Sequence, residues 1–360
     1  MNRNIKHGRR SSGFRFSLSH FLITAAILLL FAGCSKTDSG ITSLGVFVPG
    51  VVAGSPTYEM LVQGVTKAAG EHDGIQLQVI EGGFNQGEWK NKLQALASSG
   101  EFNLIVTSNP AMPQICEEIV QAVPEQRFLV LDGYLKGNPN IYTFRFNQME
   151  QAYLAGYCAG LISSSNLPHA KKTLRAGLIA GQEYPDMNQA IRPGFEFGFL
   201  DALGKDRKAD ALPVDFRIVG NWYDPGKGAD LAASIYDSGA DVILTIAGGA
   251  NMGVVAAAKE KGGYVLWFDS NGYSIAPGVI LGSTYIAVDE AAYKKTKAAI
   301  EGTLPFGTAE TGSIKDEWVS FITDDPGFKD YVTPEIADKM IVKLEEFRSG
   351  GIEMPMPIIH

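Results

Sequence analysis

From residue 41 onward, the sequence alternates short β-rich runs with helical patterns, and this alternation limits the possible folds more than any other feature. The β-rich runs form two sets: Ile41–Val48, Ile75–Ile80, Phe102–Thr107, Arg127–Leu131 and Ile141–Phe144, followed by Arg175–Ala180, Val214–Val219, Asp241–Ile246 and Tyr264–Phe268. Strands that alternate with helices pair in parallel through crossover helices. The sequence therefore predicts an α/β protein with two Rossmann-like, doubly wound lobes.

The chain is expected to pass more than once between these lobes. We expect lobe 1 to comprise residues 41–145 and about 279–305, and lobe 2 to comprise residues 146–278 and about 306–350. A late strand near Val279–Ser283 is expected to cross back to the first lobe. Asn147 and Glu150 have the spacing of a capping box. In this motif the Asn147 side chain accepts from a first-turn amide, and the Glu150 side chain accepts from the Asn147 amide. We expect Arg145 to hold this crossover rather than to contact a ligand.

The first 33 residues have the pattern of a signal peptide. Five basic residues and no acid occur in the first 15 positions, and an apolar run, Phe21–Phe31, follows. The run is too short for a stable membrane span and ends in Phe31-Ala32-Gly33-Cys34. This junction resembles a bacterial lipobox, with Phe31 in place of the usual Leu. We expect Cys34 to carry lipid, with acyl chains such as palmitate, and residues 34–40 to form a tether. An uncleaved N-terminal anchor is the alternative.

Composition limits the possible partners of the mature chain. Without the signal, 26 Lys and Arg face 39 Asp and Glu, a net charge of −13. So acidic a surface disfavours nucleic acid. Cys116 and Cys158 lie in apolar helical stretches, where two buried free thiols are expected, although a disulfide is possible outside the cytoplasm. No motif of a nucleophile or a metal site is present, so we expect a non-enzymatic protein without cofactor or metal. We also expect a monomer.

Aromatic and amide side chains recur in the loops that follow the strands. In open parallel sheets, ligands bind beyond the carboxyl ends of the strands. The candidate ligand-binding residues are Ser55, Tyr58, Asn85, Asn109, Tyr184, Trp222, Asn251, Asp269 and Asn271. Flat rings and neutral hydrogen-bonding groups suit an uncharged planar heterocycle that carries hydroxyls. Trp267 is expected in the core, and Asp269 is expected to anchor a ligand rather than to act as a base.

Several motifs in the same order resemble the basic membrane protein family. They are Phe128-Leu129-Val130-Leu131-Asp132, Phe144-Arg145-Phe146, Tyr153-Leu154-Ala155-Gly156, Pro193-Gly194-Phe195, Trp222-Tyr223-Asp224-Pro225 and Gly239-Ala240-Asp241-Val242-Ile243. This family includes the purine nucleoside receptor A type and consists of substrate-binding lipoproteins of ABC importers. The resemblance implies a type I periplasmic-binding-protein fold, with three crossovers and a ligand trapped between the lobes. It also implies a stacking role for Trp222, a hydrogen-bonding role for Asp269, and an ABC permease with its ATPase as partners.

Departures from the family pattern bear on the ligand. Nucleoside-binding members read roughly G-G-x-x-D-x-S-F-N in the first loop, whereas Val51–Tyr58 contains no acid. They also have a Lys in the strand that corresponds to Gly282–Ile286, where this chain has none. The Ser-Pro-x-Tyr loop resembles the riboflavin-binding branch, so riboflavin is the expected transported ligand. The alternatives are a purine nucleoside-binding lipoprotein of the same family, an extracytoplasmic hydrolase of nucleosides or flavins, and a ligand sensor.

Overall fold

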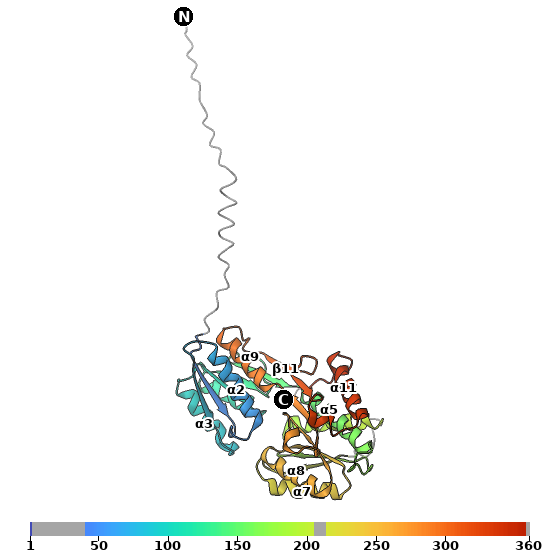
Figure 1. Cartoon of the computed structure of the whole chain (residues 1–360). Helices are drawn as coiled ribbons and strands as arrows, with labels where there is room; N and C mark the ends of the chain where they lie inside the picture. Colours follow the sequence, from blue (N-terminus) through green and yellow to red (C-terminus); the bar gives the residue numbers. More distant parts are fainter. Residues whose placement is uncertain (2–39, 205–213, 358–360) are drawn as a thin grey trace. The chain divides into compact units, whose positions relative to one another are not determined.

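The computed structural model describes Met1, residues 40–204 and residues 214–357 (Figure 1). The predicted signal peptide, the lipidated Cys34 and most of the tether lie outside the described residues. In the part of the chain that is described, no helix is both long and apolar enough to cross a membrane.

The first sheet is wholly parallel and, in the described residues, has six strands in the order β11-β5-β4-β3-β1-β2. These strands are β1 (Ser43–Val48), β2 (Gln76–Glu81), β3 (Leu104–Ser108), β4 (Arg127–Leu131), β5 (Ile141–Phe146) and β11 (Ala309–Gly312). The helices that belong to it are α2 (Pro56–Gly70), α3 (Gln86–Ser98), α4 (Met112–Ala122) and α9 (Val288–Ile300). Strands β1, β3, β4 and β5 are buried almost throughout, as parallel strands covered by helices on both faces must be.

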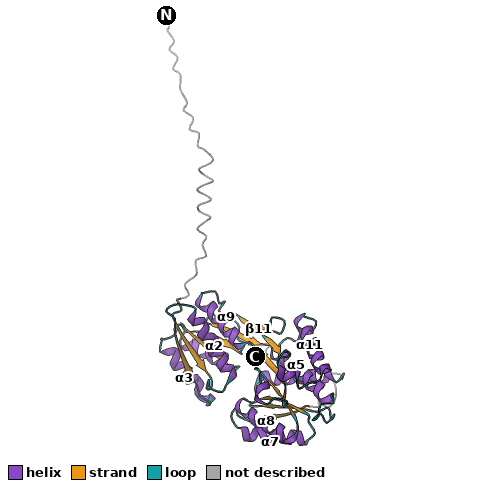
Figure 2. Ribbon diagram, viewed as in Figure 1, coloured by secondary structure: helices purple, strands orange, loops and turns teal. Residues whose placement is uncertain are grey.

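The second sheet repeats this strand order position by position, β12-β10-β9-β8-β6-β7, counted over the described residues. Its strands are β6 (Ala176–Ala180), β7 (Val214–Ile218), β8 (Val242–Ile246), β9 (Tyr264–Trp267), β10 (Ile280–Ile286) and β12 (Val319–Phe321), of which β12 is antiparallel. Its helices are α5 (Gln148–Ser164), α6 (Arg192–Ala202), α7 (Pro225–Asp237), α8 (Asn251–Lys261), α10 (Pro326–Lys329) and α11 (Pro334–Arg348) (Figure 2). Each loop of the first lobe therefore has a counterpart in the second.

The two α/β lobes predicted from the sequence are confirmed, and the described chain crosses between them three times. The crossings follow β5, β10 and β11. The predicted return of the late strand to the first lobe is wrong, because β10 pairs with β9 and stays in the second sheet. The backbone at Gly282 packs closely there, since an added Cβ would lie 2.7 Å from Leu266 and 3.0 Å from Phe321. Strand β11 joins the first sheet instead. The remaining lobe limits stay a proposal.

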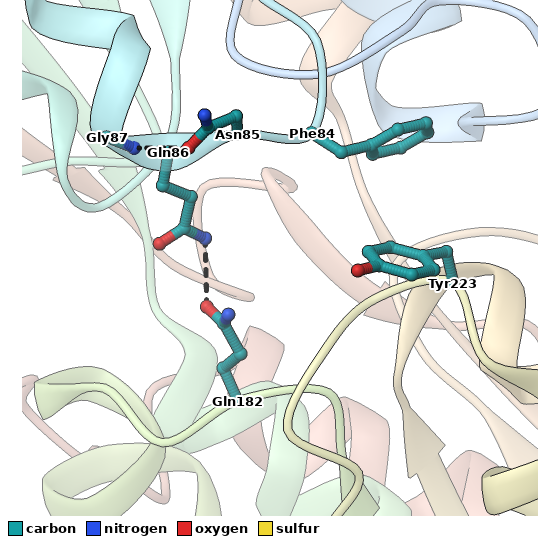
Figure 3. A pocket seen from close by; sticks show the side chains of 6 residues that line it. All are labelled: Phe84, Asn85, Gln86, Gly87, Gln182 and Tyr223. Atoms are coloured by element: carbon teal, nitrogen blue, oxygen red, sulfur yellow. Dashed lines mark hydrogen bonds between the residues drawn. The ribbon is translucent and has the colours of Figure 1, made fainter.

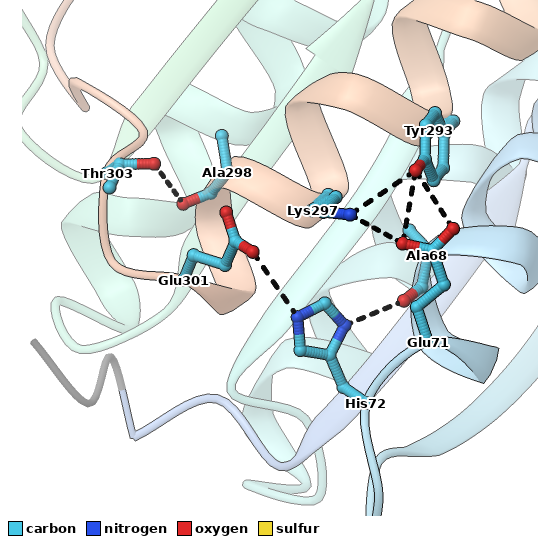
Figure 4. A network of polar contacts seen from close by, with 8 residues as sticks. All are labelled: Ala68, Glu71, His72, Tyr293, Lys297, Ala298, Glu301 and Thr303. Atoms are coloured by element: carbon cyan, nitrogen blue, oxygen red, sulfur yellow. Dashed lines mark hydrogen bonds and ion pairs between the residues drawn. The ribbon is translucent and has the colours of Figure 1, made fainter. Parts of the chain in front are cut away.

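Helix α9 docks on α2 immediately after the second crossing (Figure 1). The approach depends on Gly64, where a Cβ would lie 2.2 Å from the backbone oxygen of Asp289. Polar contacts border this seam: Lys297 donates to Glu71 at 2.6 Å and the Tyr293 hydroxyl donates to Glu71 at 2.9 Å (Figure 4). Because the ion pair is about one third exposed to solvent, the helix contact rather than the ion pair supplies most of the stability.

Buried polar contacts tie the crossings together. Asn147 caps α5 by accepting from the Glu150 amide at 3.2 Å, as predicted. The second half of the predicted capping box is wrong, because Glu150 accepts from the Ile314 amide at 2.9 Å on the third crossing. Arg145 donates to Thr311 and to the Pro357 carbonyl, both at 3.0 Å, so its predicted role at the crossover is confirmed.

The predicted core residues lie where expected. Cys116 and Cys158 are buried free thiols, and burial raises the pKa of both. Trp267 is 8% exposed. These residues pack in the core, and the candidate site lies in the loops.

Candidate functional site

Tyr58 comes from the first turn of α2, next to the carboxyl ends of the first sheet. Its hydroxyl donates to the Pro49 carbonyl at 3.1 Å. Burial raises the pKa of Tyr58 to about 12, although a hydrogen bond with the predicted neighbour Asn109 lowers it, so the hydroxyl stays neutral. Ser55 occupies the N-cap of α2, but its side chain makes no capping bond. The structure thus brings Tyr58 and Asn109 together.

Asp132 and Asp269 occupy equivalent places in the two lobes. Asp132 directly follows the buried strand β4, and Asp269 lies two residues past the end of the buried strand β9. Each has the left-handed backbone that residues other than glycine rarely adopt, with φ of 55° and 69°. Gln151 of α5 donates to Asp269 at 2.9 Å, and Gln148 of α5 donates to Asp132 at 3.4 Å. The crossover helix therefore holds both carboxyl groups. Strained residues of this kind concentrate at functional sites.

Asp132 was not among the predicted site residues. The signal was present, because Phe128-Leu129-Val130-Leu131-Asp132 and Val265-Leu266-Trp267-Phe268-Asp269 share the pattern of a buried strand that ends in aspartate. The matching role becomes visible only when the two sheets are seen to have the same strand order.

Asp186 and the predicted Tyr184 add to the same cluster. Burial raises the pKa of Asp132 well above its ordinary range, and the charges of Asp269 and Asp186 raise it further. Burial also raises the pKa of Asp186, against a smaller opposing effect of Arg145. Tyr184 has a raised pKa for the same reasons, burial first and then the charges of Asp132, Asp269 and Asp186.

Two buried acceptor oxygens at this cluster, one on Asp186 and one on Gln151, lack a hydrogen-bond donor within the described residues. Burial raises the pKa of Asp269 to about 6, against the lowering effect of its bond with Gln151. Among the described residues, Oδ1 of Asp186 and Oε1 of Gln151 are buried and have no hydrogen-bond partner. Buried acceptors without partners cost free energy, so a ligand that donates hydrogen bonds would relieve them.

Trp222 forms the aromatic side of this cluster in the second lobe. Its ring centroid lies 6.3 Å from that of Tyr184. The ring covers Gly181, where an added Cβ would lie 2.4 Å from the indole. Only glycine at position 181 permits this approach. We define the inner site as Tyr58, Asn109, Asp132, Tyr184, Asp186, Trp222 and Asp269.

Three predicted amides lie elsewhere. Asn85 caps α3 by accepting from the Gly87 amide at 3.2 Å and borders a separate pocket. Asn251 accepts from Thr245 at 2.6 Å and from the Ala247 amide at 2.7 Å. Asn271 donates to Asp325 at 2.7 Å. Asn251 and Asn271 thus stabilise their own loops, and in the described residues no side-chain hydrogen bond joins either of them to an inner-site residue. Their ligand role stays a prediction.

The inner site can accept hydrogen bonds and stack rings. Within the described residues, no group of three or more His, Cys, Asp or Glu side chains could hold a metal ion. Half-buried carboxyl groups, tyrosine hydroxyls and an indole suit recognition of an uncharged ligand rich in hydrogen-bond donors.

Comparison with known proteins gives a consistent assignment. The family model Bmp, described as ABC transporter substrate-binding protein PnrA-like, matches residues 41–351. The ABC transporter nucleoside-binding protein BmpA of Lactococcus lactis is 28% identical over 249 residues, which span 64% of this chain and 65% of that protein. An uncharacterised lipoprotein of Pyrococcus abyssi is 24% identical over 324 residues, 87% of this chain and 77% of its own length.

A solved structure is similar over nearly the whole chain. It is an ABC transporter solute-binding protein from Aeropyrum pernix, with a TM-score of 0.70 at 22% identity, covering 89% of this chain and 94% of that one. This likeness supports the type I binding-protein architecture.

Proposed function

The chain belongs to the Bmp family of PnrA-like ABC transporter substrate-binding proteins, and from that premise we propose that it captures a purine nucleoside between its lobes and delivers it to an ABC permease. The observation that carries this proposal is the pair of equivalent aspartates, Asp132 and Asp269, presented from the two lobes beside aromatic rings. Ribose hydroxyls and ring N–H groups donate hydrogen bonds, and such carboxylates accept them.

Riboflavin, the expected ligand, has less support than the nucleoside. Relatives whose names state a ligand include the nucleoside-binding protein BmpA and a purine-binding protein of Brucella abortus. The first loop, Val51–Tyr58, lacks the acid of the nucleoside-binding members, which favours riboflavin. Asp132 and Asp186 supply carboxyl groups to the inner site from other loops, so that loss does not exclude a nucleoside.

A ligand that contacts both lobes favours the closed form, because it makes contacts there that the open form cannot offer. Gln148 and Gln151 sit on α5, directly after the first crossing, and bond to one carboxyl group from each lobe. Movement at the crossing would therefore change the spacing of Asp132 and Asp269. The family assignment is that of a binding protein, and we propose that the nucleoside leaves chemically unchanged.

The charge of the inner site predicts rejection of nucleotides. A 5′-phosphate would enter a half-buried cluster of carboxyl groups in which Arg145 is the basic group that acts on Asp186. Like charges in a site of low dielectric repel by several kcal/mol. Calorimetric titration should show binding of inosine and at least 100-fold weaker binding of inosine 5′-monophosphate. Equal affinity for the two would contradict the proposed site.

Attachment to the membrane is proposed to depend on Cys34. Acyl chains contribute about 0.8 kcal/mol for each buried CH₂ group, and stable attachment takes two or more chains. The Cys34→Ser variant should therefore leave the membrane fraction and still bind inosine, because the inner site begins well after the tether. Retention of this variant on membranes after a salt wash would show that an uncleaved segment, not lipid, holds the protein.

A further inference from the structure

A pocket lies apart from the carboxyl groups of the inner site. It has a volume of about 710 Å³ and is lined by Phe84, Asn85, Gln86, Gly87, Gln182 and Tyr223, which we call the outer pocket (Figure 3). Its residues come from the loop after β2 and the first turn of α3 in the first lobe, and from the loops after β6 and β7 in the second. None of the inner-site residues lines it.

Two exposed aromatic rings face each other across the outer pocket (Figure 3). Phe84 precedes the N-cap of α3, and Tyr223 precedes the N-cap of α7, so the two occupy equivalent positions in the two lobes. Their centroids are 5.6 Å apart at an interplanar angle of 50°. Phe84 is 56% exposed and Tyr223 is 59% exposed. Large apolar side chains at this exposure leave ring surface available for stacking.

The remaining side chains that line the pocket, those of Asn85, Gln86 and Gln182, are polar and carry no charge. Gln86 donates to Gln182 at 2.8 Å and so links the two lobes. This bond uses the Gln86 nitrogen and the Gln182 oxygen, and in the described residues no other bond engages the Gln86 oxygen or the Gln182 nitrogen. One acceptor and one donor are thus available to a ligand. Glu88, which accepts from Asn85, is neutralised by Lys92 at 2.8 Å.

The outer pocket therefore differs in chemistry from the inner site. We propose that it is a second binding site, one that takes a flat, uncharged ring by stacking on Phe84 and Tyr223. The identification of that ring as a purine rests on the proposed function. Tyr223 directly follows Trp222, and Gln182 lies two residues before Tyr184, so a purine nucleoside would meet a neutral stacking surface next to the carboxyl groups.

Caffeine separates the two sites, because it is a flat, neutral purine that has no N–H to donate to the carboxyl groups. Ligand-observed NMR titration of the full-length protein should show weak, saturable caffeine binding. The Phe84→Ala/Tyr223→Ala double variant should weaken it at least tenfold, since each stacked ring contributes about 1–3 kcal/mol. Asp269→Asn and Tyr331→Ala, which changes an exposed tyrosine outside the pocket, should leave it within twofold.

The proposal fails if caffeine does not bind the parent protein, if the double variant binds it equally well, or if Asp269→Asn weakens it as strongly. A thermal melt establishes that the double variant folds, and Phe84→Tyr, which keeps a flat ring, should retain binding. If caffeine behaves as expected and inosine does not bind at all, the proposed function is wrong and the outer pocket stands.

Discussion

Replacing Asp269 with Asn is expected to weaken nucleoside binding tenfold or more and, at the same time, to stabilise the ligand-free protein at neutral pH. The binding loss follows because a hydrogen bond to a charged group contributes about 1.5–3 kcal/mol. The gain in stability follows because burial raises the pKa of Asp269 to about 6. An amide of the same shape can still accept from Gln151 and has no charge to desolvate.

The raised pKa of Asp269 determines how the stability of the protein changes with pH. An acid whose pKa is raised in the folded state contributes stability below its unfolded pKa, and that stability is lost as the pH rises through its folded pKa. The free energy of unfolding of the parent protein should therefore fall between about pH 4 and pH 7. At about 1.4 kcal/mol per pKa unit, the contribution from Asp269 is about 2–3 kcal/mol. Asp132 and Asp186, whose pKa values are also raised, act in the same direction.

Nucleoside affinity should follow pH in the opposite direction. The ligand donates to the carboxylate, so the dissociation constant should rise as the pH falls below about 6 and Asp269 takes up a proton. Denaturant unfolding at pH 4.5 and pH 7.5 measures the first effect, and titration at the same two values measures the second. Asp230→Asn, which changes an exposed residue of α7, is the matched control. A stability difference between parent and Asp269→Asn that is the same at both pH values would contradict the account.

The second large effect is expected at Trp222. Its replacement by Ala should weaken nucleoside binding about tenfold or more, because a stacked base contributes about 1–3 kcal/mol. Trp222→Phe should retain most of the affinity. Since Trp222 is half-buried in a loop, the melting temperature without ligand should change little.

Gly181→Ala tests the same ring without altering it. An added Cβ would lie 2.4 Å from the indole and must displace it. We expect this variant to lose affinity as Trp222→Ala does and to show a shifted tryptophan emission. Gly54→Ala is the control, because nothing lies within 4 Å of its Cβ, although its φ of 76° adds some strain. Parent-like binding by both Gly181→Ala and Trp222→Ala would show that the indole does not contact the ligand.

Most of the fold could be predicted because buried parallel strands read as apolar runs. Arg127–Leu131 was found with its limits intact, and the other predicted strands were close. Strand β11 was missed because Ala309-Glu310-Thr311-Gly312 is short and polar. The sheet that β10 joins depends on its contacts with β9 and β12, which lie at a distance in the sequence, so local pattern favoured the wrong lobe.

Site residues could be predicted where their position in a loop after a strand was enough to bring them into the inner site. Tyr58, Tyr184, Trp222 and Asp269 follow strand ends and lie in the inner site, although their contact with a ligand stays a prediction. Asn251 and Asn271 had the same loop signal, but an amide in a turn can equally serve its own backbone, as theirs do. Asp186 follows Tyr184 in the same loop after β6, but an acid in a loop does not by itself indicate a site, and its role becomes visible only through its effect on Asp132.

The central claim is that this protein holds an uncharged purine nucleoside between Asp132 and Asp269. Side-by-side calorimetric titration of the purified protein with inosine and with riboflavin at pH 7.5 tests it most directly. We predict saturable binding of one inosine at the inner site with clearly higher affinity than riboflavin, and loss of that binding in Asp269→Asn. Tight binding of riboflavin with no heat from inosine, guanosine or adenosine would contradict the nucleoside assignment.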